Sequence, residues 1–382
     1  MKVAVIAPYH LISDYRVLRS LRAFDKLECE TDILYDLEYG NNEFLEFDLK
    51  FKNVKLHKIK CPKKRFLKLK LPNIYTWINE FGYYISNADF VYIHDSGITG
   101  LKLSKYIKRK YSKRIIFDYH DSIDFEYFYQ LSKFKLEILY PITKFIYYKY
   151  LQQFSNYVDY TIGISRKQLG AIHSIFNDNK PSFVVPNTRK NVKSYEYDHD
   201  DHLRIVWIGT VMRGRDLERL IELSNNINIP ALEIDIFGYV LSPDLVDELK
   251  KNSKYKINFH GKYKDDSDIV NKISGKSFGI FMGWNDPYNT RINEISSPNK
   301  FFSYINVGIP VLIDSKLVSV GEILSSYNGG QHLECDSEFF ARVTEISDNY
   351  NFYQANVIKI KRSLDEDNLI NDLANYISKV SY

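Results

Sequence analysis

Short apolar runs alternate with longer amphipathic stretches along the first half of the chain. The runs at residues 3–7, 32–35, 90–93, 114–117 and 160–164 have the length and composition of buried β-strands, and helical periodicity marks residues 14–27 and 100–110. Strands that are apolar throughout and separated by helices are typical of a parallel sheet covered on both faces. This half is therefore predicted to be a doubly wound α/β domain.

The same pattern restarts after a polar stretch at residues 187–202. Strands are expected at residues 203–209, 232–237, 257–260, 278–281 and 309–313, and an amphipathic helix at 367–380 closes the chain. We predict an α/β protein with two tandem Rossmann-like doubly wound domains, residues 1–190 and 203–365, joined by a linker at 191–202 and followed by a C-terminal helix at 366–382. An interdomain cleft at the carboxyl ends of the two sheets is the expected ligand site.

Composition narrows the functional classes. No run of about eighteen apolar residues occurs, and the N-terminus lacks the charged-then-apolar layout of a signal peptide, so we expect a cytoplasmic protein. Cys29, Cys61 and Cys335 are odd in number and far apart, which argues against a disulfide framework and against a zinc site. The formal net charge of +4 is small for 382 residues and disfavours nucleic-acid binding.

The positive charge is concentrated at residues 50–70. The basic residues inside this segment are Lys52, Lys55, Lys58, Lys60, Lys63, Lys64, Arg65 and Lys68, with Phe66, Leu67, Leu69 and Trp77 among or beside them. Such a segment suits an anionic surface, whether lipid headgroups, a phosphorylated acceptor or nucleic acid, and a solvated loop and helix face is the alternative. Residues 133–150, with Phe134, Leu139, Tyr140, Phe145 and Tyr148, are a second candidate for membrane contact, with an ordinary domain helix as the alternative.

The run Ser297-Pro298-Asn299-Lys300 precedes an expected helix at 301–307. Free backbone N–H groups, the positive end of the helix dipole and the Lys300 ammonium would converge there on one anion, and a diphosphate suits such a place. A structural helix cap is the alternative. Together with the following Gly308-Ile309-Pro310-Val311, this order of residues resembles the C-terminal half of bacterial family 4-like glycosyltransferases, which have the GT-B fold.

Other motifs extend the resemblance over residues 1–335. In the second half, Gly209-Thr210-Val211-Met212-Arg213-Gly214 follows a strand and resembles the phosphate loop of the family, with Arg213 in place of a lysine. In the first half, residues 14–19, which include Asp14, Arg16 and Arg19, resemble the opening of the family's first helix. The strand ends Ile93-His94-Asp95 and Phe117-Asp118-Tyr119-His120-Asp121 resemble its strand-end motifs, and Val185-Pro186-Asn187-Thr188 resembles its exit to the linker.

The strand ends also carry a physical argument. Polar side chains at the carboxyl end of a parallel strand face the ligand side of the sheet, so His94, Asp95, His120 and Asp121 together favour a site over satisfied core residues. His120 is the first choice for contact with the donor sugar or the reacting centre. Asp121 or Asp14 would act as the base if the reaction inverts the anomeric configuration.

The sequence departs from the family pattern at three places. Retaining members carry two glutamates eight positions apart; the second falls on Ser303 here, and Glu294 lies one residue out of register with the first. Ser303 can still hydrogen-bond a ribose hydroxyl, more weakly than a carboxylate. The glycine-rich turn after the first strand is replaced by Pro8-Tyr9-His10, which indicates a differently shaped acceptor side.

A metal-binding motif of another glycosyltransferase fold also occurs. Asp266-Ser267-Asp268 matches that D-x-D pattern, but it precedes an expected helix start near Ile269, where Asp and Ser serve as caps. We therefore expect no metal and no cofactor, with Arg213 and Lys300 neutralising the leaving diphosphate.

The resemblance implies a glycosyltransferase that moves a sugar from a nucleoside-diphosphate donor, UDP favoured over GDP, to a glycan or lipid-linked acceptor in bacterial surface polysaccharide synthesis, such as capsule or lipopolysaccharide. It implies donor contacts from Gly209, Thr210, Arg213, Ser297, Pro298, Asn299, Lys300 and Ser303. The catalytic candidates are His120, Asp121 and Glu294, and the acceptor candidates are His10, Asp14, Arg16, His94 and Asp95. The alternatives are a nucleotide-sugar epimerase and a non-catalytic sugar-nucleotide or anionic-glycan binding protein.

Overall fold

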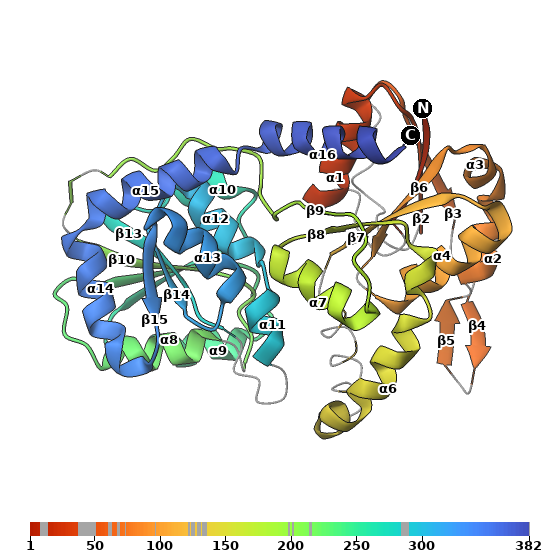
Figure 1. The fold of residues 1–382 in the computed structure, drawn as a ribbon. Helices are drawn as coiled ribbons and strands as arrows, with labels where there is room; N and C mark the ends of the chain where they lie inside the picture. Colours follow the sequence, from red (N-terminus) through yellow and green to blue (C-terminus); the bar gives the residue numbers. More distant parts are fainter. Residues whose placement is uncertain are drawn as a thin grey trace. The chain divides into compact units, whose positions relative to one another are not determined.

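The computed structural model divides the chain into two compact units, residues 1–186 with 367–382 and residues 187–366. It describes residues 1–7, 14–36, 51–59, 63–66, 69–72, 74–95, 97–120, 123, 127, 131, 136–197, 199–200, 202–213, 216–283 and 290–381. Each unit is built around a parallel sheet with helices on both faces, as predicted (Figure 1).

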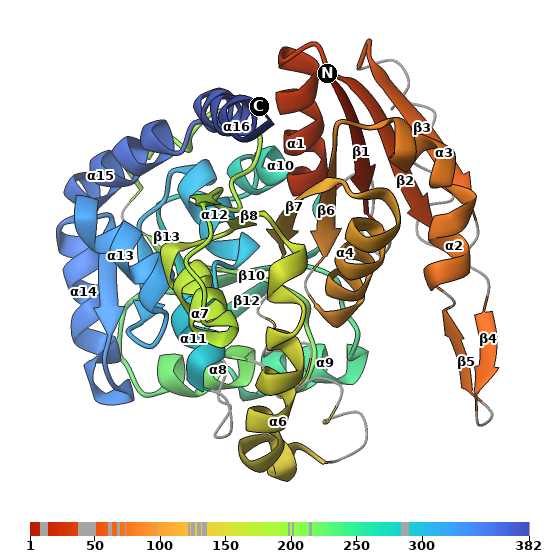
Figure 2. The same cartoon turned by 45° about the vertical axis from the view of Figure 1, so that its right-hand side comes forward.

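The first unit contains a seven-stranded parallel sheet with the order β3-β2-β1-β6-β7-β8-β9. Its strands are β1 (Lys2–Ile6), β2 (Glu30–Asp36), β3 (Val54–Ile59), β6 (Phe90–Asp95), β7 (Arg114–Tyr119), β8 (Tyr160–Gly163) and β9 (Ser182–Val184). The helices are α1 (Tyr15–Lys26), α2 (Ile74–Glu80), α3 (Gly82–Asn87), α4 (Ile98–Tyr111), α6 (Tyr140–Gln152), α7 (Arg166–Phe176) and α16 (Glu366–Ser381), with the 3₁₀ turns η3 (Glu137–Leu139) and η4 (Ser155–Tyr157). A hairpin of β4 (Lys63–Phe66) and β5 (Leu69–Pro72) lies outside this sheet (Figure 2).

The second unit contains a six-stranded parallel sheet with the order β12-β11-β10-β13-β14-β15. Its strands are β10 (Leu203–Ile208), β11 (Glu233–Phe237), β12 (Lys256–Gly261), β13 (Lys276–Phe281), β14 (Val311–Asp314) and β15 (Gly330–Leu333). The helices are α8 (Asp216–Asn225), α9 (Pro243–Asn252), α10 (Asp266–Val270), α11 (Thr290–Ile295), α12 (Asn299–Val307), α13 (Val318–Tyr327), α14 (Phe339–Asp348) and α15 (Tyr350–Ser363), with the turn η5 (Asp336–Glu338).

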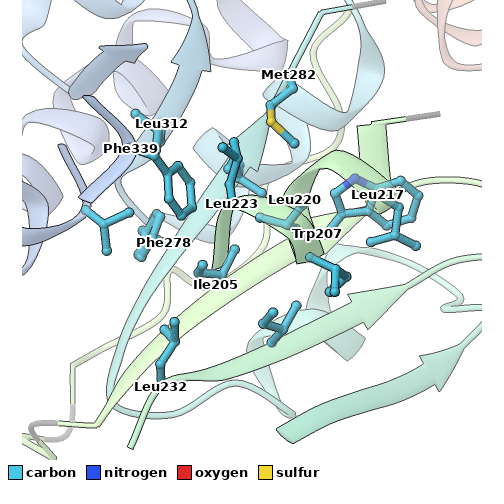
Figure 3. Packing of buried hydrophobic residues seen from close by; sticks show 14 of the residues in the cluster. Ile205, Trp207, Leu217, Leu220, Leu223, Leu232, Phe278, Met282, Leu312 and Phe339 are labelled. Carbon is cyan, nitrogen blue, oxygen red and sulfur yellow. The ribbon is translucent and has the colours of Figure 1, made fainter. Parts of the chain in front are cut away.

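The second sheet buries a separate apolar cluster on each face. Residues of α8, α9 and α14 pack on one face, where Figure 3 shows Leu217 of α8 beside Trp207 of β10. Residues of α10, α12, α13 and α15 pack on the other face. Because both faces are covered, the central strands β10, β11, β13 and β14 are largely apolar, which is why the sequence pattern identified them.

The C-terminal helix belongs to the first unit instead of forming a separate element. Ile370, Leu373, Ala374 and Ile377 of α16 lie in the same buried cluster as residues of α1. The amphipathic spacing predicted the helix correctly, but it held no information on which unit the apolar stripe would cover.

The expected linker also differs from the prediction. The boundary between the units falls after Pro186, and residues from Asn187 onward belong to the second unit. Tyr195 is 6% exposed; its backbone N–H donates to Val307 O at 2.6 Å and its hydroxyl donates to Gly275 O at 2.8 Å. The ring of Tyr195 is buried although its neighbours in the sequence are polar. Much of this segment is therefore packed onto the second unit.

The basic segment at 50–70 is only partly as expected. Lys55 and Lys58 lie on β3, which was not predicted. Trp77, expected to insert into a membrane surface, is fully buried in the core of the first unit, where it packs edge-on against Phe81. Among the described residues, no helix is both long enough and apolar enough to span a bilayer.

We predict that α16 contributes to the stability of the first unit. Ile377 is fully buried in the cluster that α16 shares with α1, so Ile377→Ala should lower the free energy of unfolding by about 2–5 kcal/mol. Asn375→Ala on the exposed side of the same helix is the matched control and should change it by less than about 0.5 kcal/mol. Equal denaturation midpoints for the two variants would contradict the assignment of α16 to this core.

Candidate active site

The first sheet brings two histidines together at its carboxyl edge. β6 ends with His94 and Asp95, and His120 follows β7 directly, with its backbone N–H donating to Asp95 O at 3.2 Å. His94 is fully buried and His120 is 6% exposed. Chain order changes direction between β1 and β6, and the carboxyl end of such a switch point is where doubly wound sheets bind ligands.

The two imidazoles lie in a hydrogen-bonded chain. The Ser20 hydroxyl donates to Val17 O at 2.8 Å and lies 2.8 Å from His94 Nε2. The other ring nitrogen of His94, Nδ1, lies 2.7 Å from His120 Nε2, and one of these two nitrogens donates its proton to the other.

Two carboxylates flank this pair. Asp118 Oδ2 lies 3.4 Å from His94 Nδ1, and Asp14 Oδ2 lies 4.0 Å from His120 Nδ1. The arrangement fits a group that accepts a proton or donates a hydrogen bond to a substrate hydroxyl.

Arg16, expected to contact an acceptor, is bound within the protein. Its guanidinium pairs with the Asp118 carboxylate and donates to Tyr119 O at 2.9 Å, at 7% exposure. Tyr92 donates its hydroxyl to the other Asp118 oxygen at 2.9 Å. Burial and the Asp118 carboxylate raise the pKa of Tyr92 well above its usual value, so this donor keeps its proton. Arg16 thus ties α1 to β7 and fixes Asp118 beneath the histidines.

The same residues have the composition of a metal site. One donor atom each from His94, Asp118 and His120 lie within 4.8 Å of one another. These donors, however, already bond to Arg16, to Tyr92 and to each other, and a guanidinium beside the carboxylate opposes a second cation. The geometry therefore fits a hydrogen-bonded network better than a metal centre.

Asp14 begins α1 and accepts from the backbone N–H of Arg16 at 2.9 Å, as an N-cap does. Asp95 is 5% exposed and accepts from the backbone N–H of Gly97 at 3.2 Å. Both carboxylates thus hold local backbone next to the histidines. His10 and Asp121 lie outside the described residues.

In the second sheet, Tyr304 positions the helix that carries Lys300. Its hydroxyl accepts from Ile208 N at 3.0 Å and donates to Ile280 O at 2.8 Å, bridging β10 and β13 beyond their last paired residues, Val206 and Gly279. Burial raises the pKa of Tyr304 well above its usual value, which keeps the donor proton in place. A Cβ at Gly279 would lie 2.3 Å from the Tyr304 ring, so glycine is required there.

Lys300, in the first turn of α12, lies at the switch point between β10 and β13. Its ammonium is 5.1 Å from the centre of the Trp207 ring and 4.4 Å from that of Phe281, and it is 3.2 Å from the Asp216 carboxylate. The Lys300 and Asp216 side chains are 14% and 7% exposed. The ammonium of Lys300 thus belongs to the N-terminal turn of α12, which begins at Asn299.

The loop with Gly209, Thr210 and Arg213 is arranged differently from expectation. The backbone N–H of Gly209 donates to Phe237 O at 2.9 Å, and a Cβ on neighbouring Gly238, whose φ is +155°, would lie 1.6 Å from Gly209 O. The glycines therefore allow two loops of the protein to approach closely. Arg213 is about half exposed and pairs with Asp244 and Glu248, each at 2.7 Å, and no contact joins it to Lys300 in the described part of the chain.

The remaining donor candidates surround the start of α12. Ser297 is buried and its carbonyl accepts from Asn187 Nδ2 at 2.9 Å, Pro298 precedes the first helical residue, and Asn299 is exposed. Ser303 is fully buried and its hydroxyl has no hydrogen-bond partner within the described residues, so contact with a ribose would require neighbouring side chains to move.

Glu294 has an exposed side chain on α11, and its carbonyl accepts from the Ser319 hydroxyl at 2.8 Å. No described contact links this carboxylate to Lys300. Its catalytic role, like the ribose contact of Ser303, stays a prediction.

The D-x-D motif has a structural role, although one residue is misassigned. The cap of α10 is Asp265, which accepts from Ser267 N, and Asp268 accepts from Lys264 N. Asp266 is 2% exposed and accepts from Arg189 at 3.1 Å and from Asn306 at 2.8 Å. Asp266 therefore holds residues 187–191 and α12 together instead of capping a helix.

Sequence reasoning missed several contributors to both sites. Ser20 and Tyr92 support the histidines, and Trp207, Phe281 and Asp216 surround Lys300. Trp207 and Phe281 could have been identified from their position at the ends of predicted strands. Asp216 could have been identified as an acidic residue at a helix start.

Comparison with known proteins agrees with this geometry. Residues 218–376 match the family model described as the C-terminal domain of glucosyltransferase 3-like proteins. No curated protein matches the chain by sequence. The assignment to a family 4-like group within the GT-B enzymes stays a prediction.

Solved structures share the fold at low sequence identity. HepE of Anabaena in complex with UDP matches with a TM-score of 0.71 at 11% identity, over 99% of this chain and 100% of that chain. The apo form of the lipopolysaccharide outer core galactosyltransferase WaaB matches with a TM-score of 0.66 at 13% identity, over 99% and 100% of the two chains.

A third match is the pneumococcal O-GlcNAc transferase GtfA in complex with UDP and GlcNAc, with a TM-score of 0.65 at 9% identity over 100% of this chain and 99% of that chain. These likenesses establish the fold, and the family model matches residues 218–376 of the 382 residues. Together the comparisons support a glycosyltransferase with the two Rossmann-like domains of the GT-B type.

Proposed function

We propose that this enzyme transfers a sugar from a nucleoside-diphosphate donor, UDP favoured over GDP, to a hydroxyl of a glycan or lipid-linked acceptor. The observation that carries the proposal is Lys300, a shielded ammonium in the first turn of a helix at the switch point of the second sheet. Structures of the same fold are titled as complexes with UDP and with UDP-glucose, which supports a uridine donor.

Lys300 would neutralise charge on the diphosphate as the bond to the sugar breaks. In the ligand-free protein, Asp216 compensates the Lys300 charge, and a diphosphate would compete for the same ammonium. Arg213 can contribute only if its side chain turns away from Asp244 and Glu248. Ser297 and Asn299 would supply backbone N–H groups around the phosphates, and Pro298, which has no N–H, would fix the backbone at the start of α12.

The first unit would supply the acceptor side of the reaction. His120, whose Nδ1 lies 4.0 Å from Asp14 Oδ2, would contact the reacting hydroxyl or the donor sugar. His94 and Ser20 would hold its orientation. We place the reaction in the cytoplasm and in bacterial surface polysaccharide synthesis; the match to WaaB, titled as a lipopolysaccharide outer core galactosyltransferase, supports this pathway.

The first experiment is incubation of the protein with a panel of nucleotide sugars, with and without glycan acceptors. We expect slow hydrolysis of one uridine donor and faster loss of that donor with an acceptor. An epimerised nucleotide sugar as the product would support the epimerase alternative. Binding without any turnover would support a non-catalytic binding protein.

We predict that Lys300→Ala weakens UDP binding by about 1.5–3 kcal/mol, because a charge-assisted contact is lost. Arg213→Ala should lose a similar amount if its guanidinium turns to the phosphates. Lys272→Ala, an exposed lysine of the same unit, is the control and should leave affinity unchanged. Calorimetry with UDP and GDP that shows wild-type affinity in both test variants would exclude this phosphate site.

We predict that His120→Ala lowers turnover by at least about a hundredfold with little change in melting temperature, because the residue follows the carboxyl end of β7 and packs against His94 rather than in the apolar core. His173→Ala, on α7 of the same unit, serves as a histidine control for activity. Full activity of the His120 variant would remove it from the mechanism. NMR of the product anomeric proton would decide whether a base such as Asp121 is required.

We predict that activity survives a chelator, because Lys300 and Arg213 supply the positive charge at the leaving group. The assay compares untreated enzyme, enzyme in EDTA, and EDTA-treated enzyme with added Mn²⁺. Activity lost in EDTA and restored by Mn²⁺ would show that a metal takes part after all.

A further inference from the structure

Helix α6 has an exposed apolar face. Ile142 is 73% exposed, Phe145 67% and Ile146 68%, and Ile138 just before the helix is 66% exposed. The spacing of these four residues places them along one stripe of a helix. In both views α6 extends away from the strands of its own unit (Figures 1 and 2). We call Ile138, Ile142, Phe145 and Ile146 the α6 stripe.

Basic residues border the α6 stripe. The Lys149 ammonium lies 5.6 Å from the centre of the Phe145 ring, and Lys144 lies 5.4 Å from that of Tyr140 and 5.5 Å from that of Tyr148. On neighbouring α4, Lys102 lies 6.0 Å from the ring of Tyr150. The aliphatic parts of these lysine side chains lie along aromatic rings, as is common where an apolar surface borders a charged one.

The charged residues of α4 and α6 are all basic. The sequences of α4 and α6 contain Lys102, Lys105, Lys108, Arg109, Lys110, Lys144 and Lys149 and no acidic residue. Lys108 is paired with Asp159 at 2.7 Å, whereas Arg109 and Lys149 are exposed. Glu137 in η3 is the one acid in residues 136–152. The surface therefore combines exposed apolar side chains with a positive rim.

We propose that the α6 stripe docks on an anionic lipid membrane. An apolar helix face edged by lysines and tyrosines matches the layers of a bilayer interface, where apolar groups enter the acyl boundary and bases meet lipid phosphates. A symmetric dimer through this face would set the same lysines against each other with few acids to pair them. Nucleic acid would not cover the exposed isoleucines.

Of the two predicted membrane contacts, this inference favours the one that includes α6 over the basic segment at 50–70, since Trp77 beside that segment is buried. It bears on the proposed function because a lipid-linked acceptor lies at such a surface. It does not depend on that function, because a protein can bind the membrane whatever reaction it catalyses.

The test is sedimentation with vesicles of phosphatidylcholine mixed with phosphatidylglycerol, compared with phosphatidylcholine alone. We expect binding to the anionic vesicles that falls sharply as salt rises from about 0.1 M to 1 M, because the Debye length shrinks from about 10 Å to about 3 Å. The triple variant Ile142→Ser, Phe145→Ser, Ile146→Ser should bind at least about tenfold more weakly.

Matched controls separate this surface from other exposed apolar groups and bases. Phe340→Ser with Phe352→Ser, which changes exposed phenylalanines of the second unit, should leave vesicle binding unchanged. Lys144→Glu with Lys149→Glu should weaken it, whereas Lys63→Glu, Lys64→Glu and Arg65→Glu together should have the smaller effect. Melting temperature and donor hydrolysis in lipid-free solution should be unchanged in all of these variants.

Three outcomes would overturn the proposal. They are wild-type protein that stays in the supernatant at low salt, a triple α6 variant that binds as well as wild type, and a solution dimer that the triple variant dissociates. Absence of donor hydrolysis in every variant, with vesicle binding intact, would count against the proposed function alone.

Discussion

The donor site depends on the phenol of Tyr304 between two strands of the second sheet. β10 and β13 are paired up to Val206 and Gly279, and beyond that point the Tyr304 hydroxyl bonds to Ile208 N and Ile280 O instead of one strand bonding to the other. A buried hydroxyl that satisfies one backbone donor and one acceptor holds the strand ends apart at no hydrogen-bonding cost. It also fixes α12, and with it Lys300, against the sheet.

The two units use the same topological position for different chemistry. In the first sheet, the switch point holds His94 and His120 beside the Arg16–Asp118 pair, so it can accept or donate a proton. In the second sheet, it holds an ammonium between aromatic rings, so it can bind an anion. A glycosyl transfer needs both functions, one for the attacking hydroxyl and one for the leaving diphosphate. This division follows from strand-end residues rather than from any difference in fold.

Apolar periodicity predicted most strands of both sheets, because residues buried on both faces leave a continuous apolar signal. It missed β3, β9 and β15, whose exposed or polar positions, such as Lys55, Ser182 and His332, break the run. It could not show that α16 packs on the first unit or that Tyr195 is buried, since both depend on contacts between residues distant in sequence.

The site residues divide in the same way. Lys300, His94 and His120 were predicted because strand and helix ends are local features. The burial of Arg16, Asp266 and Ser303 was not predicted, because it is set by partners more than thirty residues away or by packing around α12. A motif thus located the site, and only the fold shows which of its polar groups are already used within the protein.

The surroundings of Lys300 explain how a largely buried cation is kept in a protein without bound ligand. An ammonium removed from water is costly unless it is paired, and here the Asp216 carboxylate and the faces of Trp207 and Phe281 supply that compensation. A diphosphate brings more negative charge than one carboxylate, so it can take over the ammonium without leaving it uncompensated. The rings exclude water from one side of the cation, which strengthens its attraction for an anion on the open side. If Lys300 binds the donor as proposed, binding would require an exchange of partners rather than the burial of a new charge.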